Sequence, residues 1–212
     1  PRWQNYVDIW TQIPLLTFVK NTVKITVVVT LLQLFTSSFA AYAFAKMQFK
    51  GKNVLFLGYI ATIAVPWQAY MVPQFMMMSS WHLNNTHLAI MCLQAFSAFG
   101  VFLMKQFYEG VPTELCEAAR IDGLSEYGIW WHIMLPLSLP ALSTLTIFTF
   151  VNTWNDFLGP LIYLTKTELK TIQIGLRMFI TQYSAEYGLI MAASVVALIP
   201  VLICLLYTSP SP

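Results

Sequence analysis

The chain has 212 residues, of which 58% are hydrophobic and 9% charged, and its formal net charge is +2 at pH 7. Soluble domains are about half apolar and about a quarter charged, so this composition excludes an ordinary soluble protein. The few basic residues are dispersed along the chain, which argues against a nucleic-acid partner. The composition predicts a protein that is embedded in membrane lipid.

Apolar stretches of roughly 17 to 25 residues are long enough to cross the hydrocarbon core of a bilayer, and the sequence contains five of about this size. Because an open strand edge cannot satisfy its backbone in lipid, we expect each stretch to be helical. The predicted fold class is therefore all-α, a polytopic membrane helical bundle. The expected spans cover about residues 22–45, 54–75, 87–105, 135–163 and 187–206.

The loop charges predict an orientation for these spans. Three lysines lie in residues 46–52, whereas residues 79–86 contain neither Lys nor Arg. The positive-inside rule therefore places the first of these turns in the cytoplasm. Alternation then puts residues 107–134 inside and the basic loop at residues 166–177 outside. The outside location of residues 166–177 goes against the positive-inside rule, but long loops are translocated largely regardless of charge.

A polar segment interrupts the apolar pattern between the third and fourth expected spans. It reads Glu-Ala-Ala-Arg-Ile-Asp-Gly over residues 117–123 and is followed, after nine residues, by Ile-Met-Leu-Pro over residues 133–136. A helix is predicted from Pro112 to Asp122, because Pro favours a helix start and Gly123 stands where helices commonly end. Such a short helix is marginal alone in water. The segment is therefore expected to dock against a partner.

This spacing resembles the EAA loop of permease subunits in bacterial ABC importers: Glu-Ala-Ala, three residues, Gly, nine residues, Ile-x-Leu-Pro. Every fixed position of that pattern is matched. A lone Glu-Ala-Ala would carry little weight, since helices are rich in these residues, and a chance helix is the alternative reading. The full string with its fixed gap is far more specific.

Other strings are similar to the carbohydrate-uptake branch of this family, in particular the second permease subunit of maltose-type, binding-protein-dependent transporters. One of these strings, Trp-Asn-Asp-Phe over residues 154–157, has Asp156 where the family has Glu, so a carboxylic acid is kept at this position. The matching strings occupy residues 21–22, 41–46, 49–52, 121–123 and 154–157.

The resemblance implies a type I ABC importer permease fold, multi-pass in the bacterial plasma (inner) membrane. Family members usually have six spans, so the first is expected to be missing and residues 1–21 to form the external segment before the first span present. Residues 22–206 are then the transmembrane domain, with residues 107–134 as its cytoplasmic coupling loop. Residues 207–212 do not resemble the family's basic tail and are expected to be non-native or truncated.

The implied function is that of the membrane-spanning subunit of an ATP-driven, binding-protein-dependent sugar importer. Its implied partners are two ATP-binding cassette subunits (or a homodimer of them), a second related permease, an extracytoplasmic solute-binding protein and membrane lipid. The chain lacks the Gly-x-x-x-x-Gly-Lys-Ser/Thr loop that would hold ATP: before Gly51-Lys52, Lys46 replaces the first Gly, and Asn53 replaces the hydroxyl residue. We therefore expect ATP hydrolysis in a separate subunit. The histidines lack ligand spacing and no Gly-x-Ser-x-Gly motif occurs, so we also expect no enzymatic activity, no cofactor and no metal site in this chain.

Within the coupling loop, Glu117 is the expected anchor to the ATPase, through a basic residue across the interface. The alternative is a pair with Arg120 in its own helix. The two alanines are expected to allow close packing, Gly123 a sharp exit, and Pro136 to help fix where the next span begins. The expected coupling residues are Leu115, Glu117, Ala118, Ala119, Ile121, Asp122, Gly123 and Pro136.

Polar residues inside the spans are candidates for the translocation path, because such residues tend to face a bundle interior or a cavity. The alternative is that they bond between helices or, for Asp156, lie near the outer surface. Trp67 and Trp154 could stack on a sugar, but aromatic residues also serve as interfacial anchors, so neither is assigned. The candidates are Gln94, Ser97, Asn152, Asn155 and Asp156.

Three other functions stay open at this stage. The same architecture could carry a glycerol phosphate or a polyol. An ion-coupled secondary carrier would be expected to show internal repeats and midplane ionisable groups, neither of which is evident. A membrane-assembly factor could use the polar segment only for docking. The sequence does not identify the solute.

Overall fold

Long apolar runs leave the backbone no partner but itself, which favours helices throughout this chain. The computed structural model describes residues 2–180 and 187–208, and every regular element in these ranges is helical. The predicted all-α class is therefore confirmed.

The chain divides into two compact units. Three helices contribute residues to both units: α2 (Leu15–Lys46), α4 (Met71–Ser80) and α10 (Leu139–Trp154). Unit one comprises Pro1–Val29, Pro73–Leu93 and Ile147–Pro212, and unit two comprises Thr30–Val72 and Gln94–Thr146.

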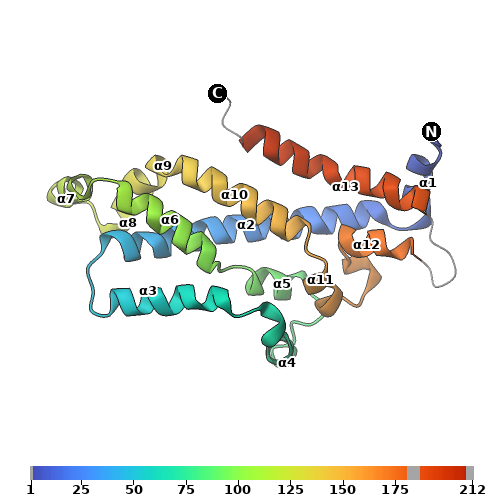
Figure 1. Ribbon diagram of the computed structural model, residues 1–212, viewed down its shortest axis with the longest axis horizontal. Coiled ribbons are helices and arrows are strands. Elements are labelled where there is room, and N and C mark those ends of the chain that lie inside the picture. The colour runs from blue at the N-terminus through green and yellow to red at the C-terminus, as the bar shows by residue number, and fades with distance from the viewer. Residues whose placement is uncertain (1, 181–186, 209–212) are drawn as a thin grey trace. The chain divides into compact units, whose positions relative to one another are not determined.

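Unit one is built around helix α13 (Tyr187–Thr208), against which the short helices α1 (Asn5–Gln12) and α12 (Ile172–Met178) pack (Figure 1). Trp154 is 1% exposed, and its indole Nε1 donates to the carbonyl of Ala197 at 3.0 Å. This indole is therefore a core group of unit one. The remaining elements of this unit are α5 (His87–Leu93), α11 (Leu158–Tyr163) and the 3-10 helix η4 (Thr167–Leu169).

The connection at residues 165–172 of unit one is held by side chains from distant parts of the chain. Asn85 Oδ1 accepts from the backbone N–H groups of residues 165 and 166, at 2.7 and 3.2 Å. Asn21 donates to the carbonyls of residues 168 and 170, at 2.8 and 3.0 Å. His87 Nε2 lies 2.9 Å from the carbonyl of residue 169, and Thr22 Oγ1 accepts from the N–H of residue 172. We call this connection the pinned loop.

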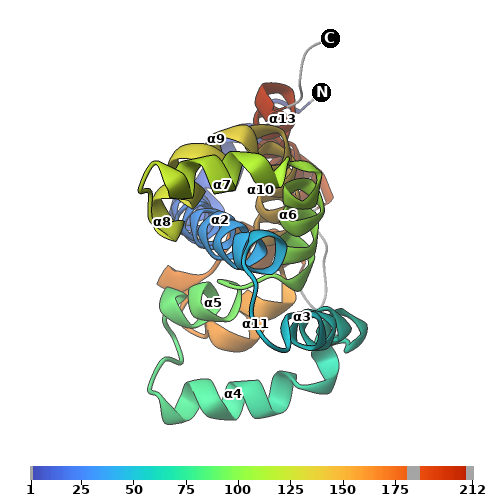
Figure 2. The same cartoon turned by 90° about the vertical axis from the view of Figure 1, so that its left-hand side faces the viewer.

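Unit two places α3 (Lys52–Ala61) beside α6 (Ala98–Gly110) and α7 (Thr113–Ile121) beside α8 (Glu126–Ile129), as Figures 1 and 2 show. A Cβ added at Gly100 would lie 2.4 Å from Ser37 Oγ, so the absence of a side chain at Gly100 allows the close approach of α6 to α2 there. The core of this unit contains Tyr42, Met104 and Met134. Its remaining elements are the 3-10 helices η1 (Thr62–Ala64) and η2 (Trp67–Ala69), the π-helix η3 (Trp130–Met134) and α9 (Leu135–Leu137).

The membrane spans are less continuous than the sequence predicted. In the described residues, α2 and Tyr187–Leu206 of α13 are each long and apolar enough to cross a membrane, and two bent helix pairs would raise the number to four. The predicted span over residues 54–75 was wrong as one helix. It breaks at Val65, whose φ of −86° and ψ of 111° are extended, because Pro66 disfavours helical geometry in the residue before it.

Polar side chains bind backbone N–H groups at two further breaks in the predicted spans. Ser97 Oγ accepts from the N–H of Gly100 at 3.0 Å and starts α6, which divides the span expected over residues 87–105. Asp156 Oδ1 accepts from the N–H of Gly159 at 3.1 Å, at the start of α11, which divides the span expected over residues 135–163.

The ends of the predicted transmembrane region also differ from expectation. Helix α2 begins at Leu15, so part of the segment expected to precede the first span is helical and continuous with it. Helix α13 reaches Thr208, and the rest of the predicted tail, residues 209–212, lies outside the described residues.

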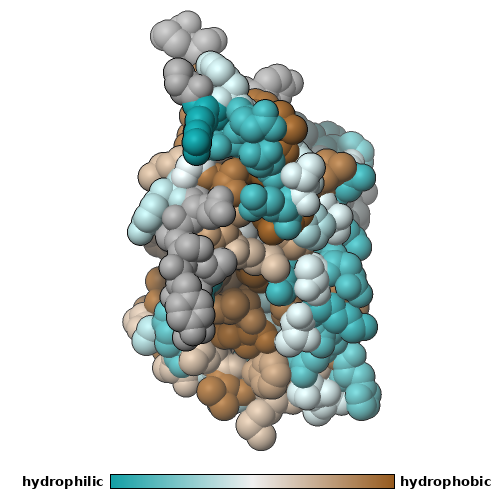
Figure 3. Space-filling model, turned by 90° about the vertical axis from the view of Figure 1, so that its right-hand side faces the viewer, coloured by the Kyte–Doolittle hydropathy of each residue, from teal (hydrophilic) through white to brown (hydrophobic). Residues whose placement is uncertain are grey.

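Large apolar side chains reach the surface in both units, among them Val54 and Leu57 of α3 and Ile203 of α13. On the face drawn in Figure 3, apolar residues lie in open view between polar ones. Water would penalise such exposure, whereas lipid would not, so this surface agrees with a membrane environment.

Candidate functional site

The helix predicted over Pro112 to Asp122 is present as α7, Thr113–Ile121, one residue shorter at each end. Gly123 has a φ of +85°, in the left-handed region that glycine adopts without strain. The N–H of Gly123 donates to the carbonyl of Arg120, and the N–H of Leu124 donates to the carbonyl of Ala119, both at 3.0 Å. These two bonds form a Schellman motif. The expected sharp exit at Gly123 is therefore confirmed.

The two faces of α7 differ strongly. Cys116 is fully buried and Ala119 is 5% exposed, and both belong to the apolar core of unit two. Burial raises the pKa of the Cys116 thiol. On the other face, Leu115 is 44% exposed and Ile121 is 86% exposed.

The sequence predicted the same role, close packing, for Ala118 and Ala119, but the two residues have different surroundings. Ala118 is exposed on α7, whereas Ala119 packs inside the chain, where its small side chain brings the helix close to its own core. Of the two alanines, only Ala118 offers its surface to a partner.

Glu117 and Asp122 are exposed, and the side chain of neither forms a hydrogen bond or ion pair within the described part of the chain. Arg120 instead binds Glu126: its Nε donates to Oε1 at 2.7 Å and its Nη2 donates to Oε2 at 3.1 Å. The pair within the helix that we considered for Glu117 is therefore absent. Among residues 2–180 and 187–208, the Glu117 carboxylate therefore has no hydrogen-bond partner, and its side chain is exposed.

Glu126 is a functional candidate that the sequence analysis missed. Its Oε2 also accepts from the hydroxyl of Tyr42, at 2.5 Å, so one carboxylate joins α7, α8 and α2. Hydrogen bonds from Arg120 hold the pKa of the Glu126 carboxyl below its usual range. The same interaction raises the pKa of the Arg120 guanidinium. A pair six residues apart across a turn has no helical spacing, so no sequence pattern indicated it.

The end of α2 makes a second polar contact with this segment. Lys46 is 7% exposed, and its Nζ donates to the carbonyl of Val111, which follows the last residue of α6. Carbonyls at the C-terminal end of a helix have no hydrogen-bond partner within the helix, so the bond from Lys46 satisfies this one.

The segment from Ile133 to Pro136 forms a helix of unusual winding. Met134 is buried in the core of unit two, whereas Pro136 is exposed in α9. The N–H of Leu135 donates to the carbonyl of Trp130, five residues back, which defines the π-helix η3. Proline has no N–H and crowds the carbonyl four residues before it, and wider winding relieves this conflict. The span that follows starts at Leu139.

Several of the residues predicted for the translocation path form hydrogen bonds inside one of the two units. In unit two, Ser97 caps α6, and the backbone carbonyl of Gln94 accepts from Gln33 at 2.7 Å. In unit one, Asp156 Oδ1 accepts from a backbone N–H at the start of α11, and Asn155 accepts from Gln173 at 3.1 Å. Asn152 is exposed. The structure does not test whether these five residues line one path, and that assignment stays a prediction.

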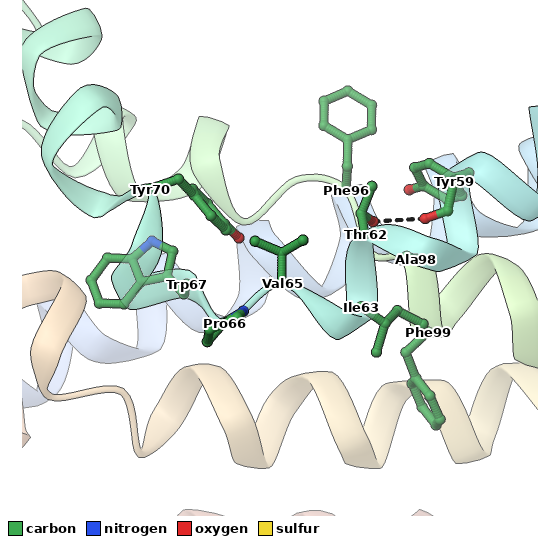
Figure 4. Close-up of a pocket in the computed structure, with 10 residues that line it drawn as sticks. All are labelled: Tyr59, Thr62, Ile63, Val65, Pro66, Trp67, Tyr70, Phe96, Ala98 and Phe99. Carbon is green, nitrogen blue, oxygen red and sulfur yellow. Dashed lines mark hydrogen bonds between the residues drawn. The ribbon is translucent and has the colours of Figure 1, made fainter.

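A pocket of about 430 Å³ lies in unit two, where the break at Val65 and Pro66 opens a space next to the start of α6. Figure 4 shows that the rings of Phe96 and Phe99 point away from one another and that the ring of Tyr70 extends toward Val65. The Thr62 hydroxyl donates a hydrogen bond to the carbonyl of Tyr59, at 2.6 Å. We assign no ligand to this pocket.

Comparison with known proteins identifies the family. The sequence pattern of the family described as "binding-protein-dependent transport system inner membrane component" matches residues 33–209. The chain belongs to this family. The inner-membrane component described here is therefore a transport permease, and its family is integral to the inner membrane.

Two relatives of this permease transport sugars, according to their names. It is 37% identical over 204 residues to the arabinooligosaccharides transport system permease protein AraQ of Halalkalibacterium halodurans, and the alignment covers 96% of this chain and 73% of the relative. It is 37% identical over 183 residues to the lactose transport system permease protein LacG of Rhizobium radiobacter, covering 86% and 67%. The resemblance to carbohydrate-uptake ABC importer permeases is thereby confirmed.

A solved structure agrees with this assignment. The permease matches a chain of a bacterial ABC transporter involved in the import of the acidic polysaccharide alginate, with a TM-score of 0.86 and 25% identity. The match covers 95% of this chain and 76% of the other. The predicted ABC importer permease fold is confirmed, and an ion-coupled secondary carrier is not favoured.

Proposed function

We propose that this permease is the membrane-spanning subunit of an ATP-driven, binding-protein-dependent sugar importer, and that α7 seats in a cleft of a separate ATPase. One observation carries the proposal: a preformed helix presents the 86% exposed side chain of Ile121 beside an unpaired carboxylate, Glu117. An apolar side chain at such exposure gains about 1.5–3 kcal/mol when a partner buries it fully.

Residues 107–134 would form the cytoplasmic coupling loop of the transmembrane domain, residues 22–206. Closure of two ATPases on ATP would pull this α7 and that of a second, related permease together and rock the spans between inward-facing and outward-facing states. The permease itself performs no bond chemistry in this scheme. An extracytoplasmic binding protein would deliver the solute.

A sugar is favoured over a glycerol phosphate or a polyol because the two relatives described above are named for oligosaccharide and lactose transport. Ligand binding to the cognate extracytoplasmic protein decides this point. Tight binding of a sugar supports the proposal, and binding of a glycerol phosphate or polyol with no sugar binding would contradict the solute class.

The docking role of Glu117 is tested by Glu117→Gln in the full-length permease, assembled with its partner subunits in vesicles. Loss of the charge should weaken capture of the ATPase and reduce ATP-dependent uptake. Glu114→Gln is the matched control, since Glu114 is an exposed glutamate in the first turn of the same helix. Equal capture and uptake in the two variants would contradict the assignment of Glu117 as anchor.

A further inference from the structure

The last two turns of α2 hold the segment that contains α7 at both of its ends. Tyr42 and Lys46 are four residues apart, so their side chains project from the same face of α2. Lys46 binds the carbonyl of Val111, two residues before α7 begins. Tyr42 binds Glu126, five residues after α7 ends.

The Glu126 carboxylate is the junction of these contacts. It accepts two hydrogen bonds from the guanidinium of Arg120, on α7, and one from the phenol of Tyr42, on α2. Bidentate, charge-assisted hydrogen bonds are stronger and more directional than neutral ones. Tyr42 is 2% exposed, so the end of the junction on α2 is fixed in the core.

Residues of both helices also belong to one apolar core. Cys116 and Ala119 of α7 are buried in the same core cluster as Ala41 and Tyr42 of α2. A close-packed interior resists deformation and transmits displacement. Helix α7 and the end of α2 therefore share one apolar core, and a polar contact from α2 reaches the chain on either side of α7.

We propose that Glu126 is a positioning residue that makes the end of α2 move with α7, so that displacement of α7 by the ATPase reaches a membrane-spanning helix. The inference rests on the proposed function, because it requires α7 to be the surface on which the ATPase acts. It adds the route by which that motion enters the spans. Glu126 touches neither ATP nor solute, and its contribution is to the yield of transport for each ATP hydrolysed.

The test uses the full-length permease with its partner permease, ATPase and binding protein in vesicles. Glu126→Gln keeps the shape of the side chain and removes its charge. We expect capture of the ATPase to change less than about twofold, while solute imported per ATP hydrolysed falls several-fold, because the weakened hydrogen bonds join α7 to α2 and do not involve the ATPase. A change confined to folding would lower capture, hydrolysis and uptake together.

Glu109→Gln is the matched control, because Glu109 is also a glutamate in an ion pair, with Lys105 four residues away, outside the junction. Tyr42→Phe is a second variant, which keeps the buried ring and removes only the hydroxyl. It should lower the same ratio, and combining it with Glu126→Gln should add little, since both act on the same hydrogen bond.

Three outcomes overturn the inference: a ratio for Glu126→Gln equal to that of Glu109→Gln, full additivity of Tyr42→Phe with Glu126→Gln, or loss of capture that parallels loss of uptake. Failure of the unaltered permease to capture the ATPase is a different result. It would overturn the proposed function itself, and the role of Glu126 with it.

Discussion

The α7 segment of unit two and the pinned loop of unit one are both polar connections between apolar helices, yet most of their backbone groups find hydrogen-bond partners of different kinds. In the pinned loop, the side chains of Asn21, Asn85 and His87 bind backbone groups of the loop. In α7, the backbone satisfies itself through helical bonds and the motif at Gly123. The first arrangement uses polar side chains to fix a conformation, whereas the second leaves Glu117 and Ile121 available for a partner.

The largest effect should follow from Ile121→Asp, which places a charge on the most outward apolar side chain of α7. If the ATPase buries this position, its capture should weaken by about tenfold or more, as at the centre of other interfaces, and uptake should fall with it. Capture of the ATPase by the full-length permease measures this.

Ile180→Asp is the control for that substitution, because Ile180 is an isoleucine of unit one with 57% exposure. It should leave capture of the ATPase unchanged. A similar loss in both variants would show that exposed apolar surface in general, and not α7, governs assembly.

The next largest effect concerns the pinned loop. Asn85→Ala removes the acceptor for two exposed backbone N–H groups, and an ordinary hydrogen bond contributes about 0.5–1.5 kcal/mol to stability. Faster proteolysis of the loop should report the loss, with capture of the ATPase unchanged. Asn85→Asp should be tolerated, since it keeps the acceptor oxygen.

Asn84→Ala is the matched control in the same turn, because the structure gives the buried Oδ1 of Asn84 no hydrogen bond. It should leave the proteolysis rate near that of the unaltered protein. Equal rates for the two alanine variants would show that the side chain of Asn85 does not hold the loop.

A smaller effect is expected for Gly123→Ala. The substituted Cβ would meet no atom within 4 Å, so its whole cost is the left-handed backbone, about 1–2 kcal/mol. That strain should disturb the exit of α7 and weaken capture of the ATPase. Gly51→Ala carries the same strain, at a φ of +82° with nothing within 4 Å, but lies outside α7. Equal weakening by both variants would contradict the role of the exit.

The smallest effect is the pH dependence of the Glu126 junction. The pKa of Glu126 is lower in the folded protein than in the unfolded chain, where a glutamate has a pKa of about 4.3. Its stabilising contribution is therefore complete above the unfolded-state pKa and is lost as the pH falls through the folded-state pKa. Thermal stability of the purified permease should therefore decline less steeply below about pH 4 in Glu126→Gln than in the unaltered chain. Identical declines would show that this carboxylate does not contribute.

Local signals in the sequence predicted the features of α7 that depend on neighbouring residues. Pro112 and Gly123 delimited the helix to within one residue at each end, because a helix start and a left-handed exit are set by the residues at those positions. The break at Val65 follows from the same kind of rule, since Pro66 restricts the residue before it. The expectation of one continuous helix there gave more weight to hydropathy than to this restriction.

Features that depend on distant packing were not predictable from one sequence. Ala118 and Ala119 are identical residues, and only the position of the core decides which one faces outward. The contact of Tyr42 with Glu126 joins residues 84 positions apart. Trp154 resembled a residue that could stack on a sugar until its hydrogen bond to Ala197 placed it in a core.

Photo-crosslinking from α7 identifies the protein that lies against this helix in the assembled transporter. A photoreactive residue replaces exposed Ala118 in the full-length, assembled permease, and in a parallel sample it replaces exposed Lys166 of the pinned loop. We expect a covalent adduct with the ATPase from position 118 and none from position 166. An ATPase adduct from position 166, with none from position 118, would contradict it.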